Sequence, residues 1–350
     1  MKILINTPAL DLLGGVANHY LGLRKFWTEN VRYNTVGRRG RISGALCLPW
    51  DVLKFIFKIQ TFRPDVVLLN PSLGASALKR DFIFLRLSRC LGVKTAVFIH
   101  GFDWNYAHSI DKKWAQRNFN RAHLIFVLAR AFKTEMQTWG VTSPIHTTTT
   151  KVDNDLVANV DFNQRDGIVD NILFVSRIVK AKGVYLLVDA FGNLKTKYPH
   201  LRLTIVGDGE EYGKLQSYIH EHGISDVNMT GRLSGQELAQ AYIDAQLFCF
   251  PTYHGEGCPT AVLEAMAFGL PIFTRKVGGL CDFFEDGKMG FITDSFEPQA
   301  FADAMEAYVL DKEKTREVAL YNAQYARRHF MASQVAVDIE NKLRNHIFNL

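Results

Sequence analysis

Short, continuous runs of β-branched and aromatic residues alternate with longer stretches of helical periodicity along the 350-residue chain. The runs predict strands at Ile3–Asn6, Val66–Asn70, Thr95–Ile99, Leu124–Leu128, Ile172–Val175, Arg202–Val206, Val227–Thr230, Leu247–Pro251 and Pro271–Thr274. Strands that are apolar throughout are buried on both faces, which is typical of parallel sheets covered by helices. The sequence therefore predicts doubly wound α/β domains, in which ligands bind beyond the carboxyl ends of the strands.

The length favours two such domains, since domains average about 150 residues. We expect the join within Thr147–Asp166, a polar stretch with little periodicity. The predicted domains are residues 1–155 and 156–333.

Charge divides the chain unevenly. Residues 1–160 hold 22 Lys and Arg against 10 Asp and Glu, a balance of +12, and residues 161–350 hold 19 against 25, a balance of −6. The basic half predicts an anionic partner. It lacks a zinc-finger, RNP-like or basic-zipper pattern, so we expect an acidic membrane surface and no nucleic acid.

Two absences narrow the class of protein further. The five cysteines form no C-x-x-C pair, so neither a disulfide framework nor a zinc site is indicated. No apolar run reaches the roughly 18 residues of a membrane span, and the N-terminus does not read as a signal peptide. We expect a cytoplasmic protein.

The densest motif runs from Pro251 to Pro271, where a strand ends, a Gly-rich loop follows, and Pro259 or Thr260 opens a helix. The free amides and dipole at such a helix start favour an anion. Glu256 in the loop and Glu264 in the helix would suit sugar and ribose hydroxyls, because a carboxylate accepts strong hydrogen bonds from a diol. The alternative is a solvated loop with a surface glutamate.

The stretch EGCPTAVLEAMAFGLPIF, followed by Gly278-Gly279 and the segment 285–291, resembles family 4 of the retaining, nucleotide-sugar-dependent glycosyltransferases. It is most similar to members that build bacterial capsules, exopolysaccharides and O-antigens. The resemblance covers nearly the whole chain and is strongest over residues 171–293. It implies a GT-B fold, with an N-terminal acceptor domain and a C-terminal nucleotide-sugar domain facing a cleft. It also implies that a C-terminal helix over about 334–350 packs back on the first domain.

The resemblance assigns Arg177 and Lys182 to the donor diphosphate, where fixed cations would stabilise the leaving group. A solvated basic turn is the alternative. Glu256 would orient the sugar hydroxyls and Glu264 would hold the ribose. His100, at a strand end, resembles the histidine that contacts the donor sugar near its reactive carbon, although a lone histidine is often structural.

The resemblance extends to further positions of the predicted site. The resemblance implies further donor contacts, several of them through the backbone, from Gly14, Gly15, Gly207, Met229, Gly231, Gly257, Cys258, Pro259 and Thr260. Asp103 would orient His100 or meet the acceptor. His19 is expected to be a helix residue at the edge of the cleft.

Asp153-Asn154-Asp155 mimics the D-x-D metal motif of the other glycosyltransferase fold, but it lies in the predicted linker, so we interpret it as coincidental. We expect no metal and no cofactor. The donor substrate would be a nucleoside-diphosphate sugar, UDP- or GDP-linked.

Trp50–Phe62 predicts a helix with a broad apolar face and a narrow lysine stripe, next to the basic run Gly37–Arg41. Packing on the N-terminal sheet and insertion into a membrane both remain open for this segment.

These observations predict a retaining glycosyltransferase that moves a hexose or N-acetylhexosamine to a lipid-linked or oligosaccharide acceptor, peripheral on the inner face of the cell membrane. A GT-B nucleotide-sugar epimerase and a non-catalytic nucleotide- or sugar-binding protein are the alternatives. A dinucleotide oxidoreductase is disfavoured, because no G-x-G-x-x-G follows the first strand. The sequence leaves the oligomeric state open.

Overall fold

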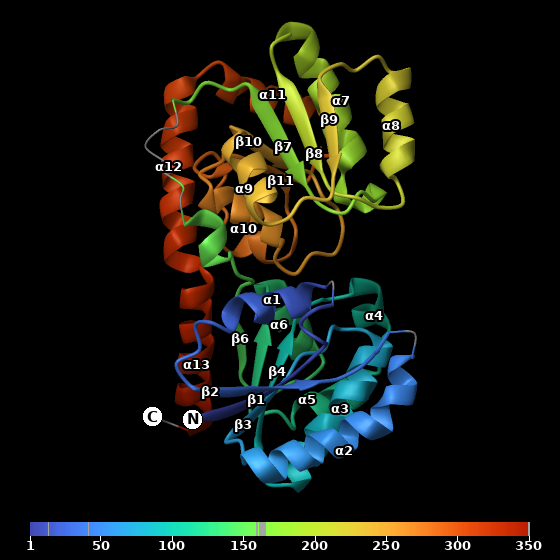
Figure 1. The fold of residues 1–350 in the computed structure, drawn as a ribbon. Helices are drawn as coiled ribbons and strands as arrows, with labels where there is room; N and C mark the ends of the chain where they lie inside the picture. Colours follow the sequence, from blue (N-terminus) through green and yellow to red (C-terminus); the bar gives the residue numbers. More distant parts are fainter. Residues whose placement is uncertain (13, 41, 159, 161–165, 349–350) are drawn as a thin grey trace. The chain divides into compact units, whose positions relative to one another are not determined.

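The computed structural model describes residues 1–12, 14–40, 42–158, 160 and 166–348. The chain folds into two compact units, which are described separately (Figure 1). Unit 1 comprises Met1–Lys151, Gly255–Cys258 and Ala332–Leu350, and unit 2 comprises Val152–His254 and Pro259–Met331. The boundaries therefore fall a few residues from the predicted ones, at 151/152 and 331/332. Part of the predicted linker, residues 159 and 161–165, lies outside the described residues.

Unit 1 contains a parallel sheet with the order β2-β1-β3-β4-β5-β6. The strands are β1 (Lys2–Thr7), β2 (Asn30–Thr35), β3 (Val66–Leu69), β4 (Lys94–Ile99), β5 (Leu124–Val127) and β6 (Ile145–Thr147). The helices are α1 (Gly15–Leu23), α2 (Gly44–Phe62), α3 (Ala75–Cys90), α4 (Trp104–Ser109), α5 (Lys112–Phe119), α6 (Arg130–Thr138) and α13 (Ala332–Phe348). From β1 the chain adds β2 on one side of the sheet and then β3 to β6 on the other side. The carboxyl ends of β1 and β3 are therefore the switch point of this unit.

The last helix, α13, is fastened to unit 1 by buried polar contacts. The carboxylate of Glu340 is 1% exposed and accepts from the backbone amides of Thr28 and Glu29, both at 2.9 Å, and from Thr28 Oγ1 at 2.6 Å. Lys94 Nζ donates to the carbonyl of Ile347 at 2.6 Å. Residues more than 250 positions apart thus share one hydrophobic core.

Unit 2 contains a second parallel sheet with the order β12-β11-β10-β7-β8-β9. Its strands are β7 (Asn171–Val175), β8 (Arg202–Val206), β9 (Val227–Gly231), β10 (Leu247–Phe250), β11 (Ile272–Arg275) and β12 (Gly290–Thr293). Its helices are α7 (Val184–Lys197), α8 (Tyr212–Glu221), α9 (Gly235–Ile243), α10 (Thr260–Ala267), α11 (Pro298–Val309) and α12 (Lys312–His329), with short 3₁₀ turns η1 (Asn154–Val157), η3 (Lys180–Lys182) and η4 (Gly278–Asp282). This is the strand order of dinucleotide-binding folds, and its switch point lies between β7 and β10.

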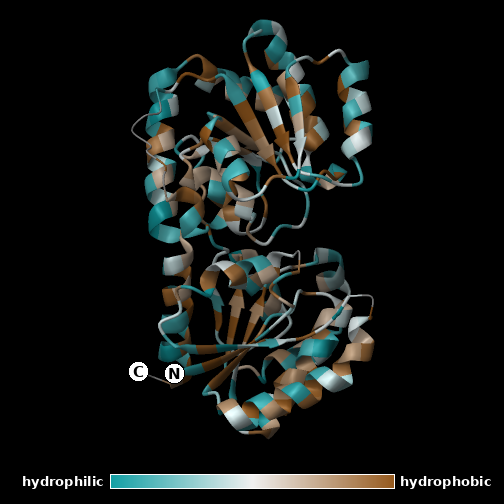
Figure 2. Ribbon diagram, viewed as in Figure 1, coloured by the Kyte–Doolittle hydropathy of each residue, from teal (hydrophilic) through white to brown (hydrophobic). Residues whose placement is uncertain are grey.

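Both sheets are wholly parallel, and their central strands are the apolar runs of the sequence, drawn in brown in Figure 2. The predicted fold class of two doubly wound domains is confirmed. Three strands were not predicted: β2, β6 and β12. All three are sheet edges, where partial exposure removes the need for a continuous apolar run.

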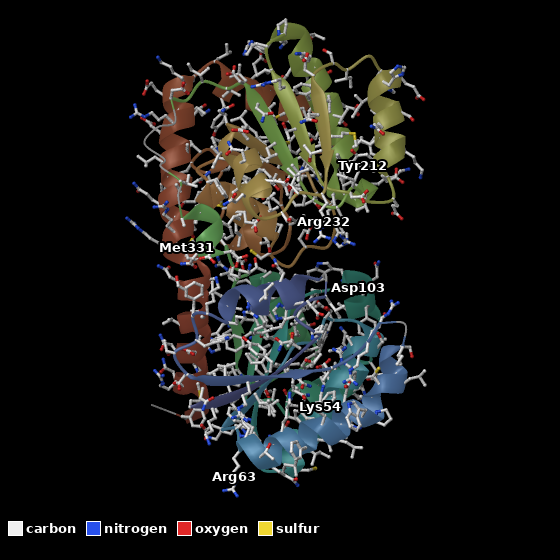
Figure 3. The ribbon with its side chains drawn as sticks, viewed as in Figure 1. Lys54, Arg63, Asp103, Tyr212, Arg232 and Met331 are labelled. Atoms are coloured by element: carbon white, nitrogen blue, oxygen red, sulfur yellow. The ribbon has the colours of Figure 1, made fainter. Side chains whose placement is uncertain are left out.

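Helix α2 contains the predicted segment Trp50–Phe62, and its lysine stripe has partners that the sequence did not reveal. Its two lysines point at edge strand β2: Lys54 Nζ (labelled in Figure 3) donates to the carbonyl of Thr35 and Lys58 Nζ to that of Tyr33, each at 2.6 Å. Burial lowers the pKa of both ammonium groups. The lysines thus cap backbone carbonyls of an edge strand, which protects that edge from pairing with another chain.

The apolar residues of α2 separate into a buried and an exposed set. Phe55, Ile59 and Phe62 are at most 6% exposed and belong to the core. Leu46, Trp50, Leu53 and Phe57 are 60–75% exposed and follow one another at helical spacing along the opposite face. Packing on the N-terminal sheet, one of the two alternatives left open by the sequence, is therefore confirmed for the buried face of α2, and the opposite face is exposed. Within the described residues, no helix has the length and hydropathy of a membrane span.

Candidate functional site

The two predicted diphosphate cations of unit 2 follow β7, one of the two strands that flank its switch point. Arg177 comes two residues after β7 and is exposed. Lys182 ends the η3 turn and is 7% exposed, with Nζ 5.9 Å from the ring centroid of Phe250 at the end of β10. Such a position over an aromatic face stabilises an ammonium ion. Both cations thus lie at the edge where this fold binds ligands.

Backbone hydrogen bonds fix the η3 turn against the loop after β10. The carbonyl of Ala181 accepts from the amides of Tyr253 at 2.9 Å and His254 at 3.0 Å. Gly183 follows at φ 77°, and a Cβ there would lie 2.1 Å from the carbonyl oxygen of Pro251. Only glycine permits this approach, so the loops of the two switch-point strands form one rigid unit.

Helix α10 begins beside these loops, as predicted. Its first hydrogen bonds run from the amides of Val262 and Leu263 to the carbonyl of Pro259, at 3.1 and 3.4 Å. The amides of Thr260 and Ala261 precede this ladder, and the helix dipole places partial positive charge there. The start of α10 is therefore suited to an anion.

Glu264 lies in the second turn of α10, and its carboxylate has a partner that the sequence did not reveal. Tyr242 of α9 is fully buried and donates from its hydroxyl to Glu264 Oε2 at 3.0 Å. Burial, and then the charge of Glu264, raise the pKa of Tyr242, so the phenol stays protonated. A buried donor thus fixes one carboxylate oxygen in place.

The predicted base-contacting segments join at the ends of β7, β8 and β9. Gly207, at φ 141°, has no room for a side chain, because a Cβ would lie 1.7 Å from the carbonyl oxygen of Ser176. Gly207 N donates to the carbonyl of Gly231 at 2.8 Å, and the Tyr212 hydroxyl (Figure 3) donates to that of Met229 at 2.9 Å. Backbone atoms therefore line the carboxyl edge of the sheet at the ends of β7, β8 and β9.

The loop Gly255–Cys258 packs with unit 1, although the predicted boundaries assigned it to the second domain. A Cβ on Gly257 would lie 2.7 Å from Leu128 Cδ1 and 2.9 Å from the carbonyl oxygen of His100. Thr150 Oγ1 donates to the carbonyl of Cys258 at 3.1 Å. The loop returns to the first unit because its glycine fits against the end of β4. Glu256, half-buried, is thereby held beside the His100 backbone.

His100 follows β4 and lies in a dense polar and aromatic cluster. Its ring stacks on Phe98 with centroids 3.8 Å apart, and Nε2 is 3.0 Å from Asn70 Oδ1. Burial lowers the pKa of His100 to about 3, so the imidazole is neutral at physiological pH. His100 is therefore a neutral hydrogen-bonding group at the carboxyl end of the sheet.

His19 is a residue of helix α1, as expected, and its side chain is buried. It is 2% exposed, and its ring centroid lies 5.0 Å from that of His100. Burial, then the nearby His100 and Lys151, place its pKa well below the usual range. The position of His19 one helical turn after Gly15 indicates that its side chain points inward, but only the tertiary structure shows that its neighbour is His100.

Asp103 does not orient His100. Its carboxylate caps α4 by accepting from the amide of Tyr106 at 3.1 Å, and the side chain is exposed (Figure 3). Gly14 is extended, and within the described residues no atom lies within 4 Å of a Cβ placed at Gly14 or Gly15. A side chain at either position would therefore meet no atom among the described residues.

Asn70 is the residue at this site that sequence reasoning missed. It directly follows the apolar run of β3, and a polar residue at the end of a buried strand is a signal that could have identified it. No cluster of three or more metal-ligating side chains occurs among the described residues. Asp153 and Asp155 lie at and within η1.

Residues 163–325 match the family model described as Glycosyl transferases group 1. The D-inositol 3-phosphate glycosyltransferase of Paenarthrobacter aurescens is 31% identical over 49% of this chain and 43% of its own length. The amylovoran biosynthesis glycosyltransferase AmsK of Erwinia amylovora is 25% identical over 76% of this chain and 66% of its own. This chain thus spans less than two thirds of either relative.

Two solved structures share the fold over the full chain. HepE of Anabaena, in complex with UDP, matches with a TM-score of 0.77 at 18% identity, over 99% of this chain and 100% of its own. Sucrose-phosphate synthase from Thermosynechococcus elongatus matches with a TM-score of 0.72 at 14% identity, over 100% of both chains. The GT-B fold class predicted from the sequence is confirmed.

Proposed function

We propose that this chain, whose residues 163–325 match the model of the group 1 glycosyl transferases, is a retaining glycosyltransferase that moves a hexose or N-acetylhexosamine from a nucleoside diphosphate. The observation that carries the proposal is the grouping of Arg177, Lys182 and the start of α10 at the switch point of unit 2. Two cations and a helix dipole in one place favour a diphosphate over a neutral ligand.

The donor we propose is UDP-linked, with GDP as the second choice. HepE has been crystallised with UDP and with UDP-glucose, and its fold extends over nearly all of this chain. The proposed contacts are the main chain at Met229 and Gly231 for the base and the Glu264 carboxylate for the ribose. Arg177, Lys182 and Thr260 would hold the diphosphate. A main-chain surface reads a base loosely, which is why both nucleotides are tested below.

The acceptor we propose is a lipid-linked or oligosaccharide sugar in cell-surface polysaccharide synthesis, taken by unit 1. AmsK is named for amylovoran biosynthesis and another relative, WcaL of Salmonella typhimurium, for colanic acid biosynthesis.

The proposed chemistry is substitution on the same face of the sugar through a short-lived oxocarbenium-like state. Negative charge grows on the departing diphosphate as the glycosidic bond breaks, and Arg177 and Lys182 stabilise it. The leaving phosphate takes the acceptor proton. Glu256 and neutral His100 orient the sugar, and the proposal includes no metal or cofactor.

Calorimetric titration with UDP, GDP, ADP and CDP tests donor binding before any acceptor is known. We expect one nucleoside diphosphate to bind at least tenfold more tightly than the others, and Arg177→Ala to weaken it. Incubation of that nucleotide's sugars with lipid and oligosaccharide extracts should then yield a product with the anomeric configuration of the donor. An inverted product refutes the retaining mechanism. An epimer formed without acceptor identifies an epimerase, and binding without turnover identifies a binding protein.

We further propose that unit 1 docks on the anionic inner face of the membrane through the exposed stripe Leu46, Trp50, Leu53 and Phe57 of α2. These apolar side chains are 60–75% exposed, and exposed Arg38, Arg63 and Lys79 lie at or near the ends of α2 and α3. An apolar helix face flanked by cations fits the interface of an anionic bilayer. The basic run also includes Arg41, which lies outside the described residues.

Flotation with phosphatidylglycerol vesicles tests this docking. We expect binding that falls with salt and is lost in Leu53→Ser/Phe57→Ser. Leu310→Ser is the matched control, because Leu310 is 69% exposed but belongs to unit 2. Equal recovery of the stripe variant and the control refutes the proposal.

A further inference from the structure

The tautomer of His100 determines what this residue offers a ligand, and its neighbour Asn70 determines the tautomer. Asn70 is 3% exposed, and its amide nitrogen donates to two backbone carbonyls, Asn6 at 2.8 Å and Leu68 at 3.2 Å. Carbonyl oxygens only accept, so the amide group cannot be reversed without placing oxygen against oxygen. Asn70 Oδ1 therefore faces away from these carbonyls.

Two side chains converge on Asn70 Oδ1. The hydroxyl of Tyr20, fully buried in α1, is 2.5 Å away, and His100 Nε2 is 3.0 Å away. Since the amide oxygen has no proton, both neighbours must donate to it. Burial raises the pKa of Tyr20 well above its usual value, which keeps its proton in place.

We infer that Asn70 is a positioning residue that fixes His100 as the Nε2–H tautomer and leaves Nδ1 as a hydrogen-bond acceptor for a ligand hydroxyl. A neutral imidazole carries one N–H proton, and the amide oxygen of Asn70 keeps that proton on Nε2. Within the described residues, no hydrogen bond to Nδ1 is formed. Stacking on Phe98 at 3.8 Å and edge contacts with His19 and Tyr20 hold the ring in place.

This inference deepens the proposed function and rests on it for the identity of the ligand. Nδ1 is an acceptor, and the carboxylate of Glu256, whose loop lies beside the His100 backbone in the same unit, is another. Acceptors bind uncharged hydroxyls and repel phosphate. A sugar hydroxyl, and neither the diphosphate nor a carboxylate, is therefore the group that His100 recognises.

Nitrogen-15 NMR of the imidazole rings tests the tautomer on the unliganded protein at neutral pH. The chain has 11 histidines, and the His100 signals are assigned as those missing from His100→Gln. We expect the Nε2–H form in the wild type and in Tyr20→Phe, which removes one donor but keeps the Asn70 acceptor. In Asn70→Asp the acceptor persists and its charge should raise the pKa of His100, whereas Asn70→Leu should lose the fixed Nε2–H state. An Nδ1–H signal in the wild type, or no change in Asn70→Leu, overturns the inference.

Kinetics then test the acceptor. Asparagine at position 100 can present an oxygen near the place of Nδ1, whereas glutamine reaches Asn70 but leaves that place empty. We expect kcat/KM of His100→Asn to exceed that of His100→Gln by about tenfold, the size of one uncharged hydrogen bond. Equal values would overturn the assignment of Nδ1. An Nε2–H signal without glycosyl transfer would refute the proposed function and support the inferred tautomer. Glycosyl transfer with an Nδ1–H signal would support the proposed function and refute the inferred tautomer.

Discussion

Acidification should destabilise unit 1 because His100 stays neutral in the fold. The folded pKa of about 3 lies below the usual 6.5, so the unfolded chain binds the extra proton. Stability is therefore fully present above pH 6.5, falls as the pH drops below 6.5, and stops falling below pH 3. At pH 5 the loss from His100 alone is about 2 kcal/mol, since each pH unit corresponds to about 1.4 kcal/mol. His19 acts in the same direction.

Tryptophan fluorescence isolates this effect, because all five tryptophans lie in unit 1: Trp27, Trp50, Trp104, Trp114 and Trp139. Urea unfolding is followed at pH 7.5, 6.5, 5.8 and 5.0, where most ordinary carboxyl groups remain ionised. We compare the wild type with His100→Gln, whose amide can still donate to Asn70.

The free energy difference between His100→Gln and the wild type should shift in favour of the variant by about 2 kcal/mol between pH 7.5 and 5.0. His108→Gln, which replaces an exposed imidazole of α4, is the control and should run parallel to the wild type. Parallel curves for His100→Gln as well would show that His100 takes up its proton at the same pH in the fold as in the unfolded chain, which refutes the reasoning.

Three further perturbations follow from the contacts described. Glu264→Gln keeps an acceptor for Tyr242 and should raise the donor KM with a smaller effect on kcat, because ribose contacts are equal in ground and transition states. Steady-state rates at saturating donor measure this, and a collapsed kcat contradicts it. Gly183→Ala places a Cβ 2.1 Å from the Pro251 carbonyl, so circular dichroism should record earlier melting of unit 2 while the fluorescence transition of unit 1 stays in place. Glu340→Ala removes the acceptor of the Thr28 and Glu29 amides, which are partly buried just before β2. It should cost unit 1 about 2 kcal/mol in urea unfolding, and an unchanged midpoint would mean that α13 is not fastened there.

The central strands and the Pro251–Pro271 motif were predictable because their signals are local. A strand that is buried on both faces must be apolar throughout. A Gly-rich loop followed by a proline indicates the start of a helix from the local sequence alone. The edge strands β2, β6 and β12 are partly exposed, so their composition lacks this constraint, and no continuous apolar run identifies them.

What only the tertiary structure decided is which polar groups meet. Tyr20, Asn70 and His100 come from three elements separated by up to 80 positions, and their hydrogen bonds depend on the order β1-β3-β4 in the sheet. Lys54 and Lys58 of α2 are a second example. Their charge alone suggests that both side chains lie in solvent, whereas both ammonium groups donate to backbone carbonyls of strand β2. Burial and hydrogen-bond partners depend on neighbours distant in sequence, and local patterns encode only which face of an element is apolar.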